Sequence, residues 1–208
     1  LVPGESTVRV RGLENHDRSV EVIHAGQRAA VNLAGVDHAD VERGQELSTA
    51  GYLAASRLMT VELSLLPTAP RELKHRTVVR AHLGTSEIMA RVSLLDASTL
   101  APGESGLAQL AFHDDAVAVW GQALVLRTES PVLTIGGGRV LDPTAIRIRR
   151  RQTDVVARLA DLASADETRR AAAALFLRGT HPWEVDDLRR LAGVEDPNRT
   201  LSELVTAG

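Results

Sequence analysis

Ser130-Pro131-Val132-Leu133-Thr134-Ile135-Gly136-Gly137-Gly138-Arg139-Val140-Leu141-Asp142-Pro143 is the stretch that decides the fold. Its segment 132–135 is rich in apolar and β-branched residues, which are typical of a strand, and prolines lie near both ends. The three glycines predict a tight β-turn. A phosphate-binding glycine loop would lead into a helix, whereas residues 139–141 indicate another strand. The stretch therefore predicts β-structure without a phosphate loop.

The surrounding residues 57–147 repeat this pattern of short strands separated by prolines and glycines. The strand candidates are Thr60–Leu65, Thr77–Leu83, Glu87–Leu95, Leu107–Phe112, Ala123–Arg127 and Val132–Ile135. Short antiparallel strands at this density are typical of a closed β-structure. We therefore expect residues 57–147 to form a β-barrel domain.

Residues 1–56 also alternate between apolar and polar side chains. Strands are predicted near residues 8–12, 20–23 and 28–34, joined by polar turns, which favours an antiparallel barrel or sandwich. Val36–Arg43 predicts a single helical turn that ends at Gly44, and Tyr52–Ser56 predicts a linker. Residues 1–56 are thus expected to form a separate β-domain.

Residues 148–208 change to a helical period. Apolar residues recur at helical spacing in Gln152–Ala163, Glu167–Arg178, Glu184–Leu191 and Asn198–Val205. The break at Gly193 between two short helices resembles a helix-turn-helix. Four arginines mark the start of this region, at Arg147, Arg149, Arg150 and Arg151. They could bind phosphates or form a solvated linker.

The composition excludes several classes of protein. The chain has 208 residues, no cysteine and a net charge of −3, so disulfides and thiolate metal sites are absent and no overall basic character points to nucleic acid. Its single lysine, Lys74, follows Leu73, whereas a P-loop lysine follows glycine. The histidines show no metal-binding spacing, and no residues form a recognisable catalytic pair. We therefore expect no metal, no catalytic residue and no nucleotide-hydrolysing site in this chain.

Three segments in this order resemble a known family. The segment 25–44, with its Gly26-Gln27-Arg28 strand and Arg43-Gly44 turn, resembles the second domain of translational GTPases of the elongation factor Tu type. The segments 75–95 and 130–143 resemble the third domain of the selenocysteine-specific elongation factors (SelB), and the helical tail resembles the start of their winged-helix region. The resemblance implies two elongation factor Tu-like β-barrels, the first truncated at its N-terminus, over residues 1–56 and 57–147. An incomplete helical and winged-helix region, residues 148–208, would follow.

The resemblance also implies a function. The family delivers selenocysteinyl-tRNA to the ribosome in the cytoplasm, using GTP and Mg²⁺ bound by a GTPase domain that we expect to be missing here. Its winged helices bind an mRNA hairpin. This chain, not itself an enzyme, would supply tRNA and RNA recognition.

The site residues follow by position in the matched segments. Arg28 matches an arginine of the aminoacyl pocket, where a permanent cation would favour the anionic selenocysteine over serine; the alternative is an arginine that pairs with a carboxylate across the barrel. Strand alternation predicts that Arg76, Arg80 and His82 share one face. The candidates for tRNA contact are His75, Arg76, Arg80, His82 and Arg91, and those for other RNA phosphates are Arg147, Arg149, Arg150 and Arg151. An ordinary solvated surface remains the alternative for each.

Two other functions remain open from the residues. A general tRNA carrier or an initiation factor would share the first segment but should lack the Gly136–Gly138 strand region and the helical tail. A DNA-binding regulator would use residues 184–205 as its reading module. That function needs basic residues on the second helix, where only Arg199 is present, next to Glu203 in the helical period.

Overall fold

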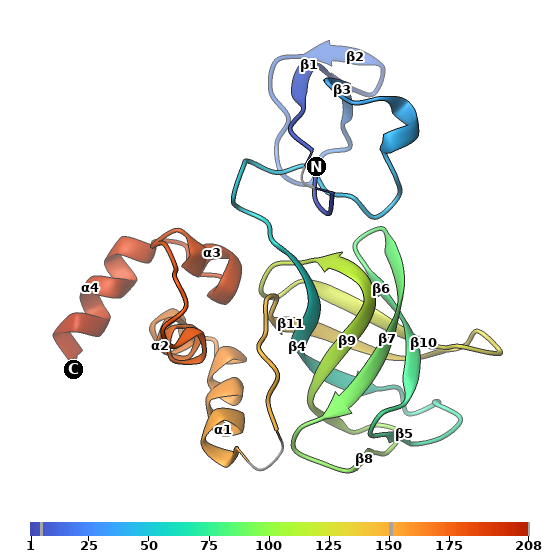
Figure 1. Ribbon diagram of the computed structural model, residues 1–208, viewed down its shortest axis with the longest axis vertical. Coiled ribbons are helices and arrows are strands. Elements are labelled where there is room, and N and C mark those ends of the chain that lie inside the picture. Colours follow the sequence, from blue (N-terminus) through green and yellow to red (C-terminus); the bar gives the residue numbers. More distant parts are fainter. Residues whose placement is uncertain (5, 150–151, 208) are drawn as a thin grey trace.

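The computed structural model describes residues 1–4, 6–149 and 152–207. Within these residues, six antiparallel strands close a barrel in the order β10-β11-β4-β9-β7-β6 (Figure 1). Closure comes from the pairing of β6 with β10. The strands are β4 (Ala55–Leu65), β6 (Val78–Leu83), β7 (Ser86–Leu94), β9 (Ser105–Val117), β10 (Ala123–Thr128) and β11 (Thr134–Asp142). A short pair, β5 (Leu73–Lys74) and β8 (Thr99–Leu100), lies beside it. The prediction of a β-barrel is confirmed, and its strands run from Ala55 to Asp142, so β4 begins inside the expected linker.

The barrel encloses an apolar core because alternate side chains of each strand point inward. Met59, Val61, Val79, Val92 and Leu110 are all completely buried. Most of their neighbours in sequence are more exposed, as the period of two predicts, but Thr60 and Gln109 are also buried, and Gln109 donates a hydrogen bond to the Ile146 carbonyl.

The prediction of a turn at Gly136–Gly138 is wrong, because these glycines lie in the middle of β11. A Cβ atom on Gly138 would lie 1.8 Å from the carbonyl oxygen of Glu62, and one on Gly136 would lie 2.5 Å from that of Ser64. Glycine is therefore needed for the close approach of β11 to β4. The turn comes earlier, where the Thr128 N–H donates to the Leu133 carbonyl at 2.9 Å.

The N-terminal region forms an open sheet. β1 (Arg9–Asn15) lies between β2 (Arg18–Val20) and β3 (Ala30–Ala34), and the expected helical turn is a 3₁₀ turn at His38–Asp40. None of the described residues up to Leu58 is buried. The first β-domain is thus present as an open three-stranded sheet in the part of the chain that the structure describes, and it does not close into a barrel there.

The C-terminal region is helical, as predicted. It comprises α1 (Thr153–Leu162), α2 (Glu167–Arg178), α3 (Asp187–Ala192) and α4 (Pro197–Ala207), and the helices lie beside the barrel in Figure 1. A continuous apolar core joins the two, because Leu95, Leu141 and Ile148 from the barrel side pack in the same cluster as Leu159 and Leu188. None of the described helices has the length and apolarity needed to span a membrane.

Trp120 fixes the helices to the barrel. Its indole N–H donates to the Leu162 carbonyl at 2.8 Å, and its backbone N–H donates to the Arg190 carbonyl at 2.7 Å. The Arg170 guanidinium lies 4.3 Å from the ring centroid, a cation–π contact. Gly193 lies so close that a Cβ atom there would be 2.1 Å from the ring. The barrel and the helices therefore form one packed unit.

Candidate nucleic-acid interface

A row of basic side chains lies on the outer face of β10, β6 and β7. The strand registers place Arg127 opposite Arg80, and Val78 opposite Arg91. His82 lies two residues from Arg80 on the same strand and therefore on the same face. The inward neighbours, such as Val79, are buried in the core, so the basic side chains point to the outside. We call Arg80, His82, Arg91 and Arg127 the basic row. Three of the five predicted tRNA contacts are thereby brought together.

Glu87 lies within the basic row, on β7 opposite His82. Its carboxylate accepts a hydrogen bond from the Arg80 guanidinium, and its second oxygen lies 3.8 Å from His82 Nε2. The hydrogen bond from Arg80 is the largest effect and lowers the pKa of Glu87. Desolvation opposes it, and the charges of Arg80, His82 and Arg127 each lower the pKa by a smaller amount. The carboxylate therefore stays ionised near neutral pH and neutralises part of the row.

Sequence reasoning missed Arg127 and Glu87. Arg127 is the last residue of a predicted strand. The alternation along that strand predicts that its side chain points outward, but not which residue of a neighbouring strand it faces. Glu87 begins a predicted strand, and only the pairing of β7 with β6 brings it next to Arg80 and His82. Register between strands is set by the whole barrel and cannot be read from one strand.

His75 and Arg76 lie away from the basic row. Arg76 precedes β6 in a left-handed backbone conformation, with φ 70°, and its N–H donates to the Val92 carbonyl at 2.7 Å. His75 donates its backbone N–H to the Ser98 carbonyl at 3.1 Å. Both side chains are exposed in this turn. The predicted strand face of Arg76, Arg80 and His82 is therefore wrong at Arg76, because the strand begins only at Val78.

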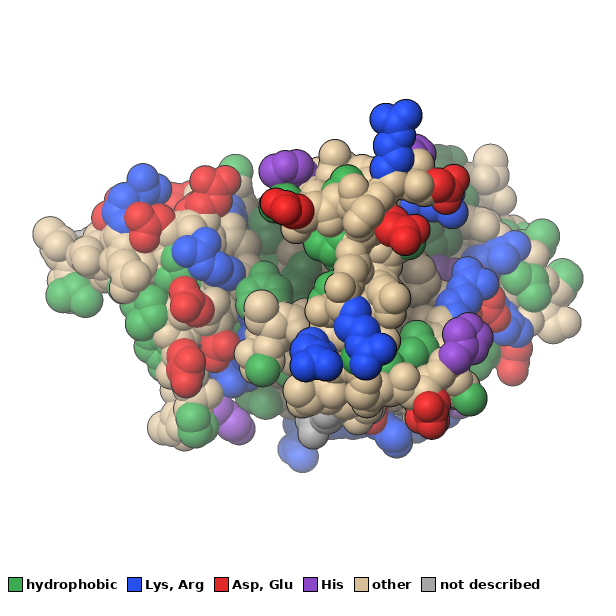
Figure 2. All heavy atoms as spheres, turned by 90° about the horizontal axis from the view of Figure 1, so that it is seen from above, with side chains coloured by type: hydrophobic (Ala, Val, Ile, Leu, Met, Phe, Trp, Pro, Cys, Tyr) green, Lys and Arg blue, Asp and Glu red, His purple; other side chains and the backbone are tan. Residues whose placement is uncertain are grey.

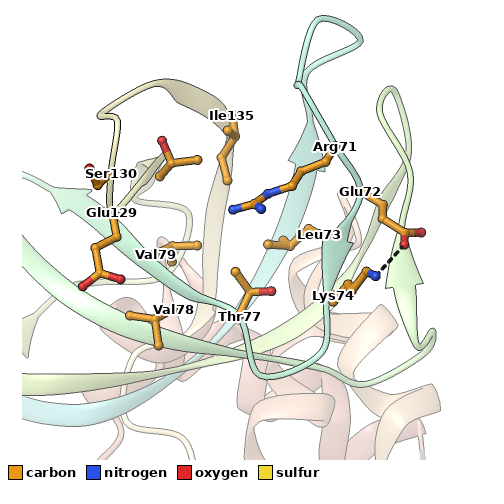
Figure 3. A pocket seen from close by; sticks show the side chains of 11 residues that line it. Arg71, Glu72, Leu73, Lys74, Thr77, Val78, Val79, Glu129, Ser130 and Ile135 are labelled. Atoms are coloured by element: carbon orange, nitrogen blue, oxygen red, sulfur yellow. Dashed lines mark ion pairs between the residues drawn. The ribbon is translucent and has the colours of Figure 1, made fainter.

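A cavity of about 460 Å³ adjoins one end of the basic row. Leu73, Val79 and Ile135 line it with apolar side chains, and Arg71 directs its guanidinium into it (Figure 3). Lys74 turns toward Glu72, with which it pairs at 3.3 Å. The cavity could hold a small group with an apolar body and a negative charge.

Arg28 is exposed in the loop before β3. It does not line any of the five main cavities formed by the described residues. Arg28 also forms no ion pair with another described residue. The enclosed pouch expected around this guanidinium is therefore not formed by the described residues. The reason is the open sheet, which has no closed inner face on which Arg28 could be held.

The arginines before α1 are divided between described and undescribed residues. Arg147 and Arg149 are exposed, whereas Ile148 between them is 7% exposed. The Ile148 N–H donates to Gln109 Oε1 at 3.0 Å, which fixes the backbone and turns both arginines outward. Arg150 and Arg151 lie outside the described residues.

The remaining surface carries mixed charge. Figure 2 shows acidic and basic side chains interspersed on one face, rather than one continuous basic patch. Among the described residues, no group of three or more His, Asp or Glu side chains is arranged to hold a metal ion. The basic row is therefore a local feature of the barrel.

Comparisons with known proteins point to one family. Residues 58–147 match the family described as selenocysteine-specific elongation factor, beta-barrel domain. A selenocysteine-specific elongation factor of Desulfomicrobium baculatum is 36% identical over 195 residues, which cover 94% of this chain and 31% of the relative. That of Escherichia coli strain K12 is 30% identical over 83% of this chain and 26% of the relative. The chain thus spans less than a third of these relatives.

A solved structure shares the fold. The crystal structure of bacterial selenocysteine-specific elongation factor EF-Sec superposes with a TM-score of 0.73 and 24% identity. The match covers 93% of this chain and 30% of that one. The two proteins therefore share their fold over most of this chain.

Proposed function

We propose that this chain, which belongs to the family of selenocysteine-specific elongation factors, forms the part of such a factor that holds selenocysteinyl-tRNA for delivery to the ribosome. The observation that carries this proposal is the basic row on the outer face of β10, β6 and β7. Duplex RNA is recognised largely through its phosphates and 2′-hydroxyls, and guanidinium groups bind phosphate with two parallel hydrogen bonds. A row of outward arginines on a rigid barrel suits that task.

The basic row would contact the tRNA backbone first. Arg80 and Arg91 would bind phosphates, and His82 would donate a hydrogen bond between them. His75 and Arg76, in the turn before β6, would extend the contact toward the end of the barrel. Arg147 and Arg149, which point outward before α1, would supply a second phosphate contact next to the helices.

Arg28 would contact the aminoacyl end. A selenol is largely ionised at neutral pH, so a guanidinium attracts selenocysteine more than it attracts serine. Because Arg28 is exposed, this contact would be screened by water and would contribute less than an enclosed one.

GTP hydrolysis would belong to the complete factor and not to these residues. The only lysine of the chain, Lys74, lacks the preceding glycine of a phosphate loop and is paired with Glu72. We therefore propose that GTP and Mg²⁺ act outside this chain. The complete factor would work in the cytoplasm with the ribosome and an mRNA hairpin.

The DNA-binding alternative receives little support from the helices. Arg190 pairs with Asp187 at 2.9 Å, and Arg199 pairs with Glu203 at 3.5 Å. These ion pairs neutralise cations that a reading helix would direct at phosphates. The curated relatives at hand are likewise selenocysteine-specific elongation factors, which supports this family over the alternatives.

The proposed function is tested by binding of the 208-residue chain to selenocysteinyl-tRNA, an elongator tRNA and duplex DNA of equal charge. We expect the strongest binding to selenocysteinyl-tRNA. Arg127→Gln should weaken tRNA binding roughly three- to tenfold and reduce the slope of affinity against salt by about 1. Arg199→Gln, which removes a cation that is paired on α4, is the matched control and should change affinity less. Equal affinity for all three nucleic acids would reject the proposal.

A further inference from the structure

Glu87 holds the position in the basic row that a phosphate would occupy. One carboxylate oxygen accepts from Arg80, and the other lies 3.8 Å from His82 Nε2. Arg127, on the neighbouring strand, lies opposite Arg80 and adds a second guanidinium to the cluster. Two oxygens directed at two donors reproduce the way in which the non-bridging oxygens of a phosphodiester are bound.

We propose that Glu87 is a built-in counter-ion that a backbone phosphate of bound RNA displaces, and that it thereby sets how tightly and how selectively this face holds RNA. The inference rests on the proposed function only in the identity of the RNA. The exchange itself requires no more than a phosphodiester and the described cluster.

The pairing in the cluster is incomplete, which makes the exchange favourable. Within the described residues, Nε of Arg80, Nε of Arg127 and Nε2 of His82 are covered from solvent and have no hydrogen-bond partner. A single carboxylate cannot satisfy two guanidinium groups and an imidazole. A phosphate that replaced it would bring more acceptor oxygens to the same donors.

The position of Glu87 also allows it to move. Its side chain is 46% exposed, and among the described residues it pairs with the side chains of Arg80 and His82 rather than with the backbone. Exposed ion pairs of this kind are weak, because water competes with both partners. The carboxylate can therefore turn into solvent without unfolding of β7.

A counter-ion of this type favours selectivity. Glu87 repels any approaching phosphate, so an RNA that reaches only Arg80 gains little. When an RNA also contacts Arg91 and the arginines before α1, the free energy of these contacts offsets the cost of displacing Glu87. A built-in repulsive group of this kind weakens wrong complexes more than the right one.

The test compares the 208-residue chain with Glu87→Gln, using a short duplex RNA and selenocysteinyl-tRNA as probes. The substitution keeps the shape and removes the charge. We expect duplex RNA to bind about two- to fivefold more tightly, the range for release of an exposed ion pair, and the preference for selenocysteinyl-tRNA to fall. Glu203→Gln on α4 removes the same charge from another exposed ion pair and should leave both affinities unchanged.

A second comparison separates exchange from a general charge effect. In an Arg80→Gln background, Glu87→Gln should lose most of its effect, because the two residues act as a pair. An unchanged or weaker affinity of Glu87→Gln for duplex RNA, or an equal gain with and without Arg80, would overturn the inference. If the unsubstituted chain shows no preference for selenocysteinyl-tRNA, the proposed function is rejected. Tighter binding of duplex RNA by Glu87→Gln would still support the exchange in that case.

Discussion

The barrel and the N-terminal sheet use the same antiparallel strand pattern and differ in burial. Met59, Val61 and Val79 in the barrel are completely buried, whereas no described residue up to Leu58 is buried. The cause is closure. Each barrel strand pairs with a strand on either side, so the barrel encloses an interior that is shielded from water. In the N-terminal sheet, β2 and β3 are free edges, and neither face of the sheet is covered. The alternation of apolar residues therefore does not by itself create a core.

The two regions also attach to the rest of the molecule differently. The helices share an apolar core with the barrel. The N-terminal sheet is joined to the barrel mainly by hydrogen bonds, in which the Gly44 N–H donates to Thr85 Oγ1 at 3.1 Å and Ser86 Oγ donates to the Gly44 carbonyl at 3.2 Å. Burial at this junction raises the pKa of Glu46, against the effect of a hydrogen bond with Gln122. Because net hydrogen-bond energies are small, we expect the sheet to open more readily than the barrel.

The largest effect is expected from a methyl group placed where β11 meets β4. Gly138→Ala puts a Cβ atom 1.8 Å from the Glu62 carbonyl oxygen, so the strands must separate. We expect a loss of about 3 kcal/mol in the free energy of unfolding, measured with urea. Gly12→Ala on β1 is the control, since no atom lies within 4 Å of its new Cβ atom, and it should change stability by less than about 0.5 kcal/mol. Similar losses in both variants would contradict the contrast between the regions.

The next effect concerns the junction of barrel and helices. Trp120→Ala removes the hydrogen bond to Leu162, the contact with Arg170 and the packing against Gly193. We expect a loss of about 2–3 kcal/mol, and unfolding of the helices at lower urea than the barrel, measured by circular dichroism. Trp183→Ala is the control, because Trp183 is 37% exposed in the loop before α3. A single transition, unchanged from the unsubstituted chain, would show that Trp120 does not join the two parts.

The sequence predicts the barrel and the helices well because both depend on local periodicity. Glu167–Arg178 is predicted with the bounds that the structure shows. The error at Gly136–Gly138 has a non-local cause. Gly136 and Gly138 are needed because of carbonyl groups of β4, more than 70 residues earlier in the chain, and Gly137 because of the Leu124 carbonyl on β10. A run of glycines typical of a turn looks the same as a run required by a close neighbouring strand.

The candidate site is less predictable for a related reason. Arg80, His82 and Arg91 were identified from matched segments, but Glu87 and Arg127 join them only through the registers of β6 with β7 and β10. Arg28 was identified in the same way, and its exposure depends on the open sheet around it. Residue type and spacing indicate which side chains could bind an anion, whereas enclosure depends on tertiary structure.

A smaller effect is expected at the end of β11, where the carboxylate of Asp142 is largely enclosed. Burial raises its pKa, while the Thr144 N–H and the charges of Arg178 and Arg190 act in the opposite direction. The folded protein therefore binds this proton more tightly than the unfolded chain does. The resulting stability is fully present below the unfolded pKa and is lost as the pH rises through the folded pKa.

Asp142→Asn tests this difference because asparagine does not titrate. The variant should gain stability relative to the unsubstituted chain as the pH is raised from about 4 to about 7, measured by urea unfolding at each pH. The effect should appear in the barrel transition and not in the opening of the N-terminal sheet. A stability difference that stays constant over this pH range would mean that Asp142 titrates alike in the folded and unfolded states.

The smallest effect is expected at Arg28, on the exposed sheet. An enclosed guanidinium would discriminate selenocysteinyl-tRNA from seryl-tRNA by roughly 1–3 kcal/mol, the range for a hydrogen bond to a charged group. Because water screens an exposed charge, Arg28→Ala should reduce that discrimination by less than about 1 kcal/mol, measured from the affinities for the two aminoacyl-tRNAs. Arg18→Ala on β2 removes another exposed cation and should leave discrimination unchanged. A larger loss for Arg28→Ala would mean that bound tRNA encloses this side chain, so that the open sheet becomes a closed site only in the complex; no loss at all would remove Arg28 from the aminoacyl contact.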